Sequence, residues 1–192
     1  MRCTNSNRAH DHNSFRVFFI LMAELTLVIG GARSGKSRYA ESLIAKMPSP
    51  WTYVATAEAL DAEMTQRVAE HRARRGEEWQ TLEAPRDLPG ALAALPANAV
   101  VLVDCLTLWL SNLLLAGADI GAETARLDGA LGKMSGHVVL VANEVGWGIV
   151  PDNALARRFR DLQGRLNQHI AARADRVMLV VAGLPLVVKG EA

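Results

Sequence analysis

The feature that most constrains this chain is a glycine-rich segment, LVIGGARSGKSRY, at residues 27–39. It contains the pattern G-x-x-x-x-G-K-[ST], in which glycines let backbone N–H groups turn inward around the phosphates of a nucleotide. In this pattern Lys36 reaches the β and γ phosphates, Ser37 ligates Mg²⁺, and the following helix offers its positive end. An apolar run before the motif and a helical pattern after it disfavour a turn that binds nothing. The predicted phosphate-binding residues are Gly30, Gly31, Ala32, Arg33, Ser34, Gly35, Lys36 and Ser37.

From Leu25 onward, short apolar runs alternate with longer segments of helical period, which is typical of a parallel sheet with helices on both faces. Strands are expected at residues 25–29, 51–55, 99–103, 138–142 and 176–181, and helices near 36–47, 58–75, 106–116, 123–134 and 153–174, with a short helix near Ala91. Residues 183–188 predict a hairpin-like return, antiparallel at a sheet edge. We therefore predict an α/β fold, a mostly parallel, doubly wound P-loop NTPase domain over residues 22–192, with no second domain.

The N-terminal residues 1–21 are polar and unpatterned, and we expect a disordered or misassigned extension, with Met22 as an alternative start. The apolar run 17–23 loosely resembles a signal peptide, but it is too short to span a bilayer and no small-residue cleavage site follows. The two cysteines, Cys3 and Cys105, are too few for a disulfide framework. These observations favour a cytoplasmic protein without membrane insertion.

The overall charge is nearly balanced, because 21 Lys and Arg residues face 20 Asp and Glu residues, leaving a net charge of +1. No global field therefore draws the protein to nucleic acid or to an anionic membrane. Any basic function must be local, and we expect no nucleic-acid partner.

A second apolar run, residues 100–103, ends in Asp104. Ligands of parallel α/β sheets bind beyond the carboxyl ends of the strands, where P-loop proteins place an aspartate that holds the metal. We therefore predict Ser37 and Asp104 as Mg²⁺ ligands. Asn143 and Glu144 end the next strand at the same edge, and from the residues alone they either orient a substrate or begin a turn.

The segment 62–79, AEMTQRVAEHRARRGEEW, places four arginines around His71, which borders an apolar helical stripe. One interpretation is a solvated basic helix end, whose cations interact favourably with the helix dipole. The other is a nucleophile: nearby positive charges disfavour protonation of the imidazole, and the same arginines neutralise the phosphates under attack. The residues alone leave both open.

Four blocks of the chain resemble one family, the bifunctional adenosylcobinamide kinase / adenosylcobinamide-phosphate guanylyltransferases of cobalamin biosynthesis. They are GGARSGKSRYAE (30–41), YVATAEALDAEMTQRVAEHRARR (53–75), VDCLTLWLSNLL (103–114) and NEVGWGIVPDNALARRFRDLQGRLNQ (143–168). The blocks occur in family order, and the resemblance covers residues 25–190. The last block is the most specific of the four.

The resemblance implies an enzyme that phosphorylates adenosylcobinamide with ATP or GTP and then transfers GMP from GTP to adenosylcobinamide phosphate. It also implies a homotrimer with a recombinase-like core. His71 aligns with the family's guanylylated histidine, which joins Lys36 as a predicted catalytic residue. Besides the phosphate loop, the nucleotide-contacting positions implied are Thr56, Ala57, Glu58, Arg72, Ala73, Arg74, Arg75, Glu83 and Asp104.

Three features depart from the family pattern: the extra leader, Gly76 where a proline is usual, and Asp104 where some members have glutamate. Two other classes remain as alternatives. A GTP-binding switch would use the D-x-x-G segments 87–90 and 161–164, but neither follows a buried strand and no N-K-x-D element follows. A nucleic-acid motor would rely on Arg157, Arg158, Arg160 and Arg165.

Overall fold

The computed structural model describes residues 24–58 and 75–191, and within them a seven-stranded sheet in the order β3-β2-β4-β5-β1-β6-β7. The strands are β1 (Glu24–Gly30), β2 (Trp51–Ala55), β3 (Trp79–Glu83), β4 (Val100–Asp104), β5 (His137–Asn143), β6 (Arg176–Val181) and β7 (Leu184–Lys189). All neighbouring pairs are parallel except β6 and β7, which pair antiparallel at one edge. The predicted mostly parallel sheet with an antiparallel return is therefore confirmed.

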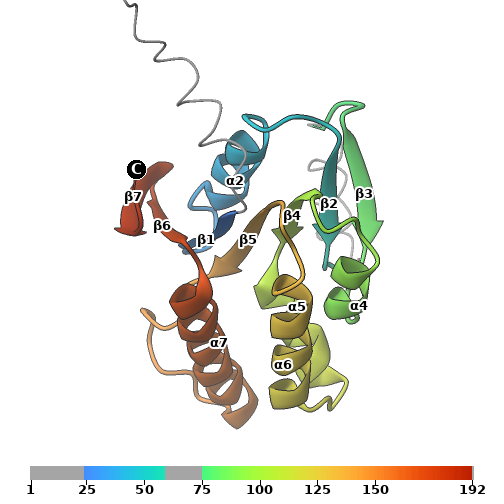
Figure 1. Cartoon of the computed structure of the whole chain (residues 1–192). Helices are drawn as coiled ribbons and strands as arrows, with labels where there is room; N and C mark the ends of the chain where they lie inside the picture. The colour runs from blue at the N-terminus through green and yellow to red at the C-terminus, as the bar shows by residue number, and fades with distance from the viewer. Residues whose placement is uncertain (1–23, 59–74, 192) are drawn as a thin grey trace, which may run out of the picture.

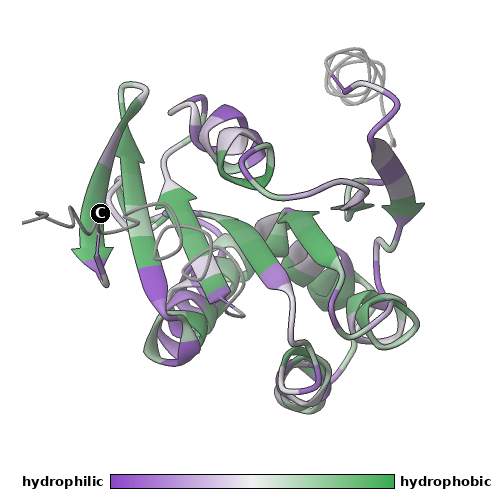
Figure 2. Cartoon of the chain, turned by 45° about the horizontal axis from the view of Figure 1, so that its top comes forward, coloured by the Kyte–Doolittle hydropathy of each residue, from purple (hydrophilic) through white to green (hydrophobic). Residues whose placement is uncertain are grey.

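Helices cover both faces of the sheet (Figure 1). They are α2 (Lys36–Ile44), α4 (Leu88–Ala93), α5 (Leu106–Leu115), α6 (Ile120–Leu131) and α7 (Ala154–Arg173). One buried cluster joins α4, α5, α6 and α7 to the sheet, and a second joins α2 to the opposite face. Within β4, Val101 and Val103 belong to the first cluster and Leu102 to the second, as expected for side chains that alternate across a strand. This burial on both faces explains the continuous apolar runs of the central strands, which are green in Figure 2.

Strand β3 was not predicted from the sequence. Its residues, WQTLE, pair in parallel with β2 at the edge of the sheet, and three of its five side chains are exposed. An edge strand packs few side chains into the core, so it carries no long apolar run. The sequence signal that identified the central strands was therefore missing.

Helix α6 also differs from prediction, since it begins three residues earlier than expected, at Ile120, and ends at Leu131. The side chain of Asp119 accepts a hydrogen bond from the backbone N–H of Ala122 and caps the helix. The helix predicted near 58–75 lies almost wholly outside the described residues, as does the extension 1–21.

Candidate nucleotide-binding site

The phosphate loop follows β1, an interior strand of the sheet that lies between β5 and β6. Glycine is required at Gly30, because an added Cβ would lie 2.5 Å from the backbone oxygen of Val180 and 2.6 Å from Ser34 Oγ. It is required at Gly35 for another reason, a positive φ of 94° immediately before α2. Both glycines belong to the predicted phosphate loop, and close packing at Gly30 and backbone conformation at Gly35 explain why glycine stands there.

Backbone hydrogen bonds hold the loop to the strands on either side. The N–H of Glu144, just beyond β5, donates to the Gly30 oxygen at 3.0 Å, and the N–H of Gly183, between β6 and β7, donates to the Ser34 oxygen at 2.8 Å. The ammonium of Lys36 donates to the Gly31 oxygen at 3.1 Å. Gly31, Ala32 and Arg33 are exposed, so the backbone of this loop is accessible to a ligand.

Asp104 ends β4, which β5 separates from β1 in the sheet. The hydroxyl of Tyr53, from β2, donates to Asp104 Oδ2 at 3.3 Å. Burial, and then the charge of Asp104, raise the pKa of Tyr53, so the phenol stays protonated and remains a donor. The predicted metal-binding carboxylate thus lies at the same carboxyl edge as the phosphate loop.

Cys105 follows Asp104 and is buried. Burial, and then the charge of Asp104, raise the pKa of its thiol to about 11, while Lys36 acts in the opposite direction. The charges of Asp104 and Lys36 therefore act in opposite directions on the pKa of the same buried thiol. At neutral pH the thiol is protonated, and its role here is packing.

The donor set offered by this edge suits Mg²⁺, because the carboxylate of Asp104 and the hydroxyl of Ser37 supply hard oxygen ligands. Within residues 24–58 and 75–191, no group of three or more His, Cys, Asp or Glu side chains could hold a metal ion alone. This sparse set fits an ion that keeps several waters and takes further oxygens from nucleotide phosphates.

A second part of the edge, which we call the β2–β3 rim, comprises residues 56–58 after β2 and 83–87 at the end of β3 and beyond it. A cavity of about 550 Å³ opens there. Its lining residues are Glu58, Glu83, Ala84, Pro85, Arg86, Asp87 and Ala91. Arg86 and Glu58 form a salt bridge of 3.0 Å across it, so the two segments face each other.

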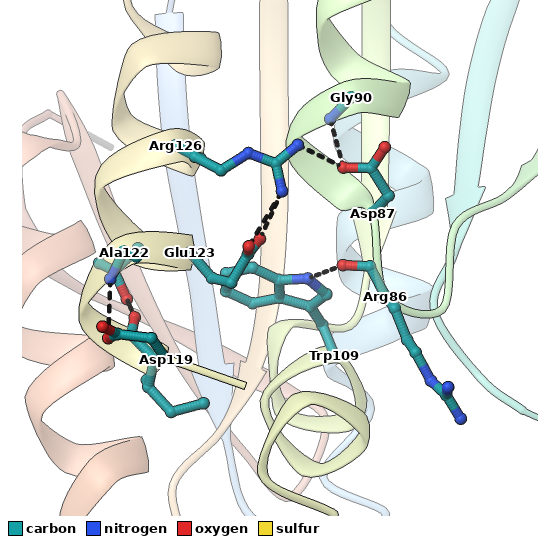
Figure 3. Close-up of polar contacts among 10 residues, drawn as sticks. Arg86, Asp87, Gly90, Trp109, Asp119, Ala122, Glu123 and Arg126 are labelled. Carbon is teal, nitrogen blue, oxygen red and sulfur yellow. Dashed lines mark hydrogen bonds and ion pairs between the residues drawn. The ribbon is translucent and has the colours of Figure 1, made fainter. Parts of the chain in front are cut away.

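Helix α5 holds this rim through side chains that sequence reasoning did not identify. Asn112 Nδ2 donates to the backbone oxygens of Thr56 and Pro85, both at 2.9 Å. Trp109 Nε1 donates to the Arg86 oxygen at 2.8 Å, as Figure 3 shows. One signal was present in the sequence: Asn112 is a lone amide among the leucines of LTLWLSNLLL.

Thr56 was predicted as a nucleotide contact, and its side chain is fully buried. Its hydroxyl donates to the Cys105 oxygen and accepts from the Cys105 N–H, both at 2.7 Å. The side chain therefore joins the end of β2 to the turn after β4. Its nucleotide contact stays a prediction, as do those of Ala57, Glu58 and Glu83.

Asp87, the first residue of one D-x-x-G segment, caps α4 by accepting a hydrogen bond from the Gly90 N–H at 3.1 Å. Arg126 of α6 bridges Asp87 and Glu123, each at 2.8 Å (Figure 3). This exposed network joins α4 to α6 on the helical face. The second D-x-x-G segment begins at Asp161, inside α7, so both segments have local structural roles.

Arg75 is the described member of the predicted basic cluster. Its guanidinium carbon lies 3.5 Å from the centre of the Tyr53 ring. Its Nε and Nη1 atoms are buried and have no hydrogen-bond partner among the residues that the structure describes. Because Tyr53 in turn hydrogen-bonds Asp104, this arginine belongs to the same edge. His71, Arg72, Ala73 and Arg74 lie outside the described residues.

Asn143 and Glu144, whose role the sequence left open, differ in their surroundings. Glu144 begins a turn, because its Oε1 accepts from the Gly146 N–H at 3.0 Å. Asn143 is held through its backbone, whose N–H donates to Thr107 Oγ1 at 2.7 Å and whose oxygen accepts from Asn167 Nδ2 at 3.0 Å. Its side-chain Oδ1 is buried and has no hydrogen-bond partner within residues 24–58 and 75–191, so the side chain of Glu144 has a local structural role there that the side chain of Asn143 does not show.

The fold and this edge define a P-loop nucleotide-binding protein. Solved structures support this class at the level of the fold. The chain aligns with FlaH, a flagellar accessory protein from Methanocaldococcus jannaschii, at a TM-score of 0.51 and 12% identity, covering 88% of this chain and 80% of that one. An ATPase from the type III secretion system of pathogenic bacteria aligns at a TM-score of 0.56 and 11% identity, covering 90% of this chain and 60% of that one.

The family is identified by sequence. The model of the cobinamide kinase / cobinamide phosphate guanyltransferase family, CobU, matches residues 26–188, and the chain belongs to this family. It is similar to the bifunctional adenosylcobalamin biosynthesis protein CobP of Pseudomonas aeruginosa, with 50% identity over 86% of this chain and 97% of that protein. The bifunctional adenosylcobalamin biosynthesis protein CobU of Escherichia coli is 44% identical to this chain, over 86% of this chain and 99% of that protein. The chain is therefore an enzyme of the kinase and guanylyltransferase class, as the sequence resemblance predicted.

Proposed function

We propose that this enzyme phosphorylates the aminopropanol hydroxyl of adenosylcobinamide with ATP or GTP, and then transfers GMP from GTP to that phosphate through a GMP–His71 intermediate. The observation that carries the proposal is the family match over residues 26–188, together with a phosphate loop, Asp104 and Arg75 at one edge of the sheet. The products are adenosyl-GDP-cobinamide and pyrophosphate.

In the kinase step, the N–H groups of residues 30–37 surround the β and γ phosphates, and Lys36 turns from the Gly31 oxygen toward them. Ser37 and Asp104 would hold Mg²⁺, which would supply positive charge to neutralise the charge that develops on the phosphates. The substrate hydroxyl attacks the γ-phosphorus and loses its proton to water. The bond between the γ-phosphorus and the β,γ-bridging oxygen breaks, and ADP or GDP leaves with that oxygen. Positioning and charge stabilisation provide most of the catalysis.

In the second step, a neutral nitrogen of His71 attacks the α-phosphorus of GTP, and pyrophosphate leaves. A phosphate oxygen of adenosylcobinamide phosphate then attacks the same phosphorus, the N–P bond breaks, and histidine is regenerated. Arg72, Arg74 and Arg75 stabilise the charge on the phosphates. Among the described residues, the buried Nε and Nη1 atoms of Arg75 have no acceptor, which supports this role because a phosphate would supply one.

The nucleotide base and ribose are placed at the β2–β3 rim, where residues 56–58 and Glu83 fall on the family's nucleotide-contacting positions. The cavity of about 550 Å³ supports this placement, since pockets for small ligands lie in the range of about 300–1,000 Å³. Two of the lining residues, Glu58 and Arg86, form a salt bridge of 3.0 Å.

We also propose one domain over residues 22–192 that assembles as a homotrimer and works in the cytoplasm. Strand β7 supports assembly, because it is an edge strand whose six residues are all exposed and four of them are large and apolar. No helix among residues 24–58 and 75–191 has the length and apolar character to cross a membrane.

The direct test is incubation with GTP that carries a radioactive α-phosphate, followed by denaturing electrophoresis. We expect a covalent label on the protein, which is lost when adenosylcobinamide phosphate is added. The same GTP labelled at the γ-phosphate should leave no label. An enzyme that makes the GDP-linked product without ever becoming labelled would contradict the intermediate.

A further inference from the structure

The loop between β5 and α7 exposes large apolar side chains at the nucleotide-binding edge. Trp147 is 75% exposed, Ile149 98% and Val150 59%. We call these three residues the β5–α7 apolar surface. Adjacent exposed apolar side chains of this size usually mark a binding site.

The β5–α7 loop begins beside the phosphate loop. The loop leaves β5 at Glu144, whose N–H is bonded to the Gly30 oxygen at 3.0 Å. Trp147 therefore lies only three residues along the chain from a direct contact with the start of the phosphate loop.

The loop is held at both ends, which favours a preformed surface. At its start, Glu144 Oε1 accepts from the Gly146 N–H at 3.0 Å. At its end, Arg157 Nη1 donates to the Pro151 oxygen at 2.9 Å, and Asn153 Oδ1 caps α7 at the Ala156 N–H. Because these bonds limit the freedom of the loop, binding there loses less conformational entropy.

We propose that the β5–α7 apolar surface binds the corrin macrocycle of the cobinamide substrate. This inference rests on the proposed function. The reacting hydroxyl of cobinamide sits on a side arm of a large, flat ring system. When that hydroxyl approaches the γ-phosphate, the macrocycle must lie outside the loop, against neighbouring surface. An indole and two aliphatic side chains provide the broad apolar contact that such a ring requires.

The exposed apolar residues of β7 fit this role less well. They lie on an edge strand with backbone groups open to pairing, which suits a second copy of the chain. The β5–α7 apolar surface lies on a loop, which has no row of strand backbone groups open to pairing. This loop starts at the end of β5, the strand that pairs with β1. The two surfaces thus provide a candidate site and a matched control.

The experiment is calorimetric titration of dicyanocobinamide into enzyme saturated with a non-hydrolysable ATP analogue. We expect Trp147→Ala to weaken binding about tenfold or more, equivalent to about 1.4 kcal/mol. Trp147→Phe should restore most of the affinity, and Val188→Ala on β7 should bind as the parent does. In turnover assays, Trp147→Ala should raise the KM for adenosylcobinamide and leave the KM for GTP unchanged.

Parent-like corrinoid affinity in the double variant Trp147→Ala, Ile149→Ala would overturn the inference and leave the proposed function intact. Sedimentation of the same variant tests a second occupant: loss of oligomers would assign the surface to contacts between copies and also overturn it. A parent enzyme that neither binds nor phosphorylates cobinamide would contradict the proposed function itself.

Discussion

The phosphate loop and the β2–β3 rim lie at the same edge of the sheet, but different interactions hold them. The loop is fixed by backbone hydrogen bonds and by glycines whose missing side chains permit close packing, as at Gly30. The rim is fixed by side chains of α5, chiefly Asn112 and Trp109. A single side-chain substitution can therefore loosen the rim and leave the loop in place.

This difference corresponds to the two reactions proposed for the enzyme. In this proposal, phosphoryl transfer depends on the loop and its lysine, whereas guanylylation also needs the segment between β2 and β3, which contains His71. If this division is correct, substitutions in the two regions should change the two activities in different proportions.

The largest effect is expected from Lys36→Ala. Removing the ammonium group takes away charge stabilisation of the phosphates, and phosphorylation of adenosylcobinamide should fall by about 10²-fold or more. Lys46→Ala, at an exposed position after α2, is the matched control and should retain parent turnover. Kinase turnover within threefold of the parent in Lys36→Ala would contradict the assignment.

Gly30→Ala should damage both activities, because the new Cβ would be forced against the backbone of β6. We expect a loss of about 1–3 kcal/mol in the free energy of unfolding, measured by urea denaturation. Gly31→Ala is the stability control, since a Cβ there meets no atom within 4 Å. Equal stabilities of the two variants would show that close packing does not determine the loop.

Asn112→Ala should affect the rim more than the loop. It leaves the oxygens of Thr56 and Pro85 without their donor, at a cost of about 1–3 kcal/mol. The KM for GTP in guanylylation should rise severalfold, with a smaller change in phosphorylation. Ser111→Ala, one residue earlier on α5, should change neither value. Equal losses in both reactions would remove the distinction between the regions.

The sequence predicted the phosphate loop, the position of Asp104 at the end of a strand, and the central strands. Each of these features is determined by residues that are close together in the sequence. Glycine spacing determines the loop, and a continuous apolar run marks a strand such as β4 that is buried on both faces. The hydrogen bond from Asn112 to Thr56 joins residues 56 positions apart, so local patterns carry no record of it. Strand β3 was missed for a related reason, since its place is decided by pairing with β2.

The smallest effect is expected from removing residues before Met22. Strand β1 begins at Glu24, and within the described residues it pairs with β5 and β6. A chain that starts at Met22 should therefore keep the parent's melting temperature and both activities. A clear fall in melting temperature would show that the leader packs on the core.

The most direct measurement is chromatography of the corrinoid products made by His71→Asn with GTP and adenosylcobinamide. Asparagine cannot form the covalent link to GMP, while Lys36, Ser37 and Asp104 remain for phosphorylation. We expect adenosylcobinamide phosphate to accumulate and adenosyl-GDP-cobinamide to be absent. Arg74→Ala, which keeps the nucleophile, should form the GDP-linked product slowly. Continued production of adenosyl-GDP-cobinamide by His71→Asn would contradict the account.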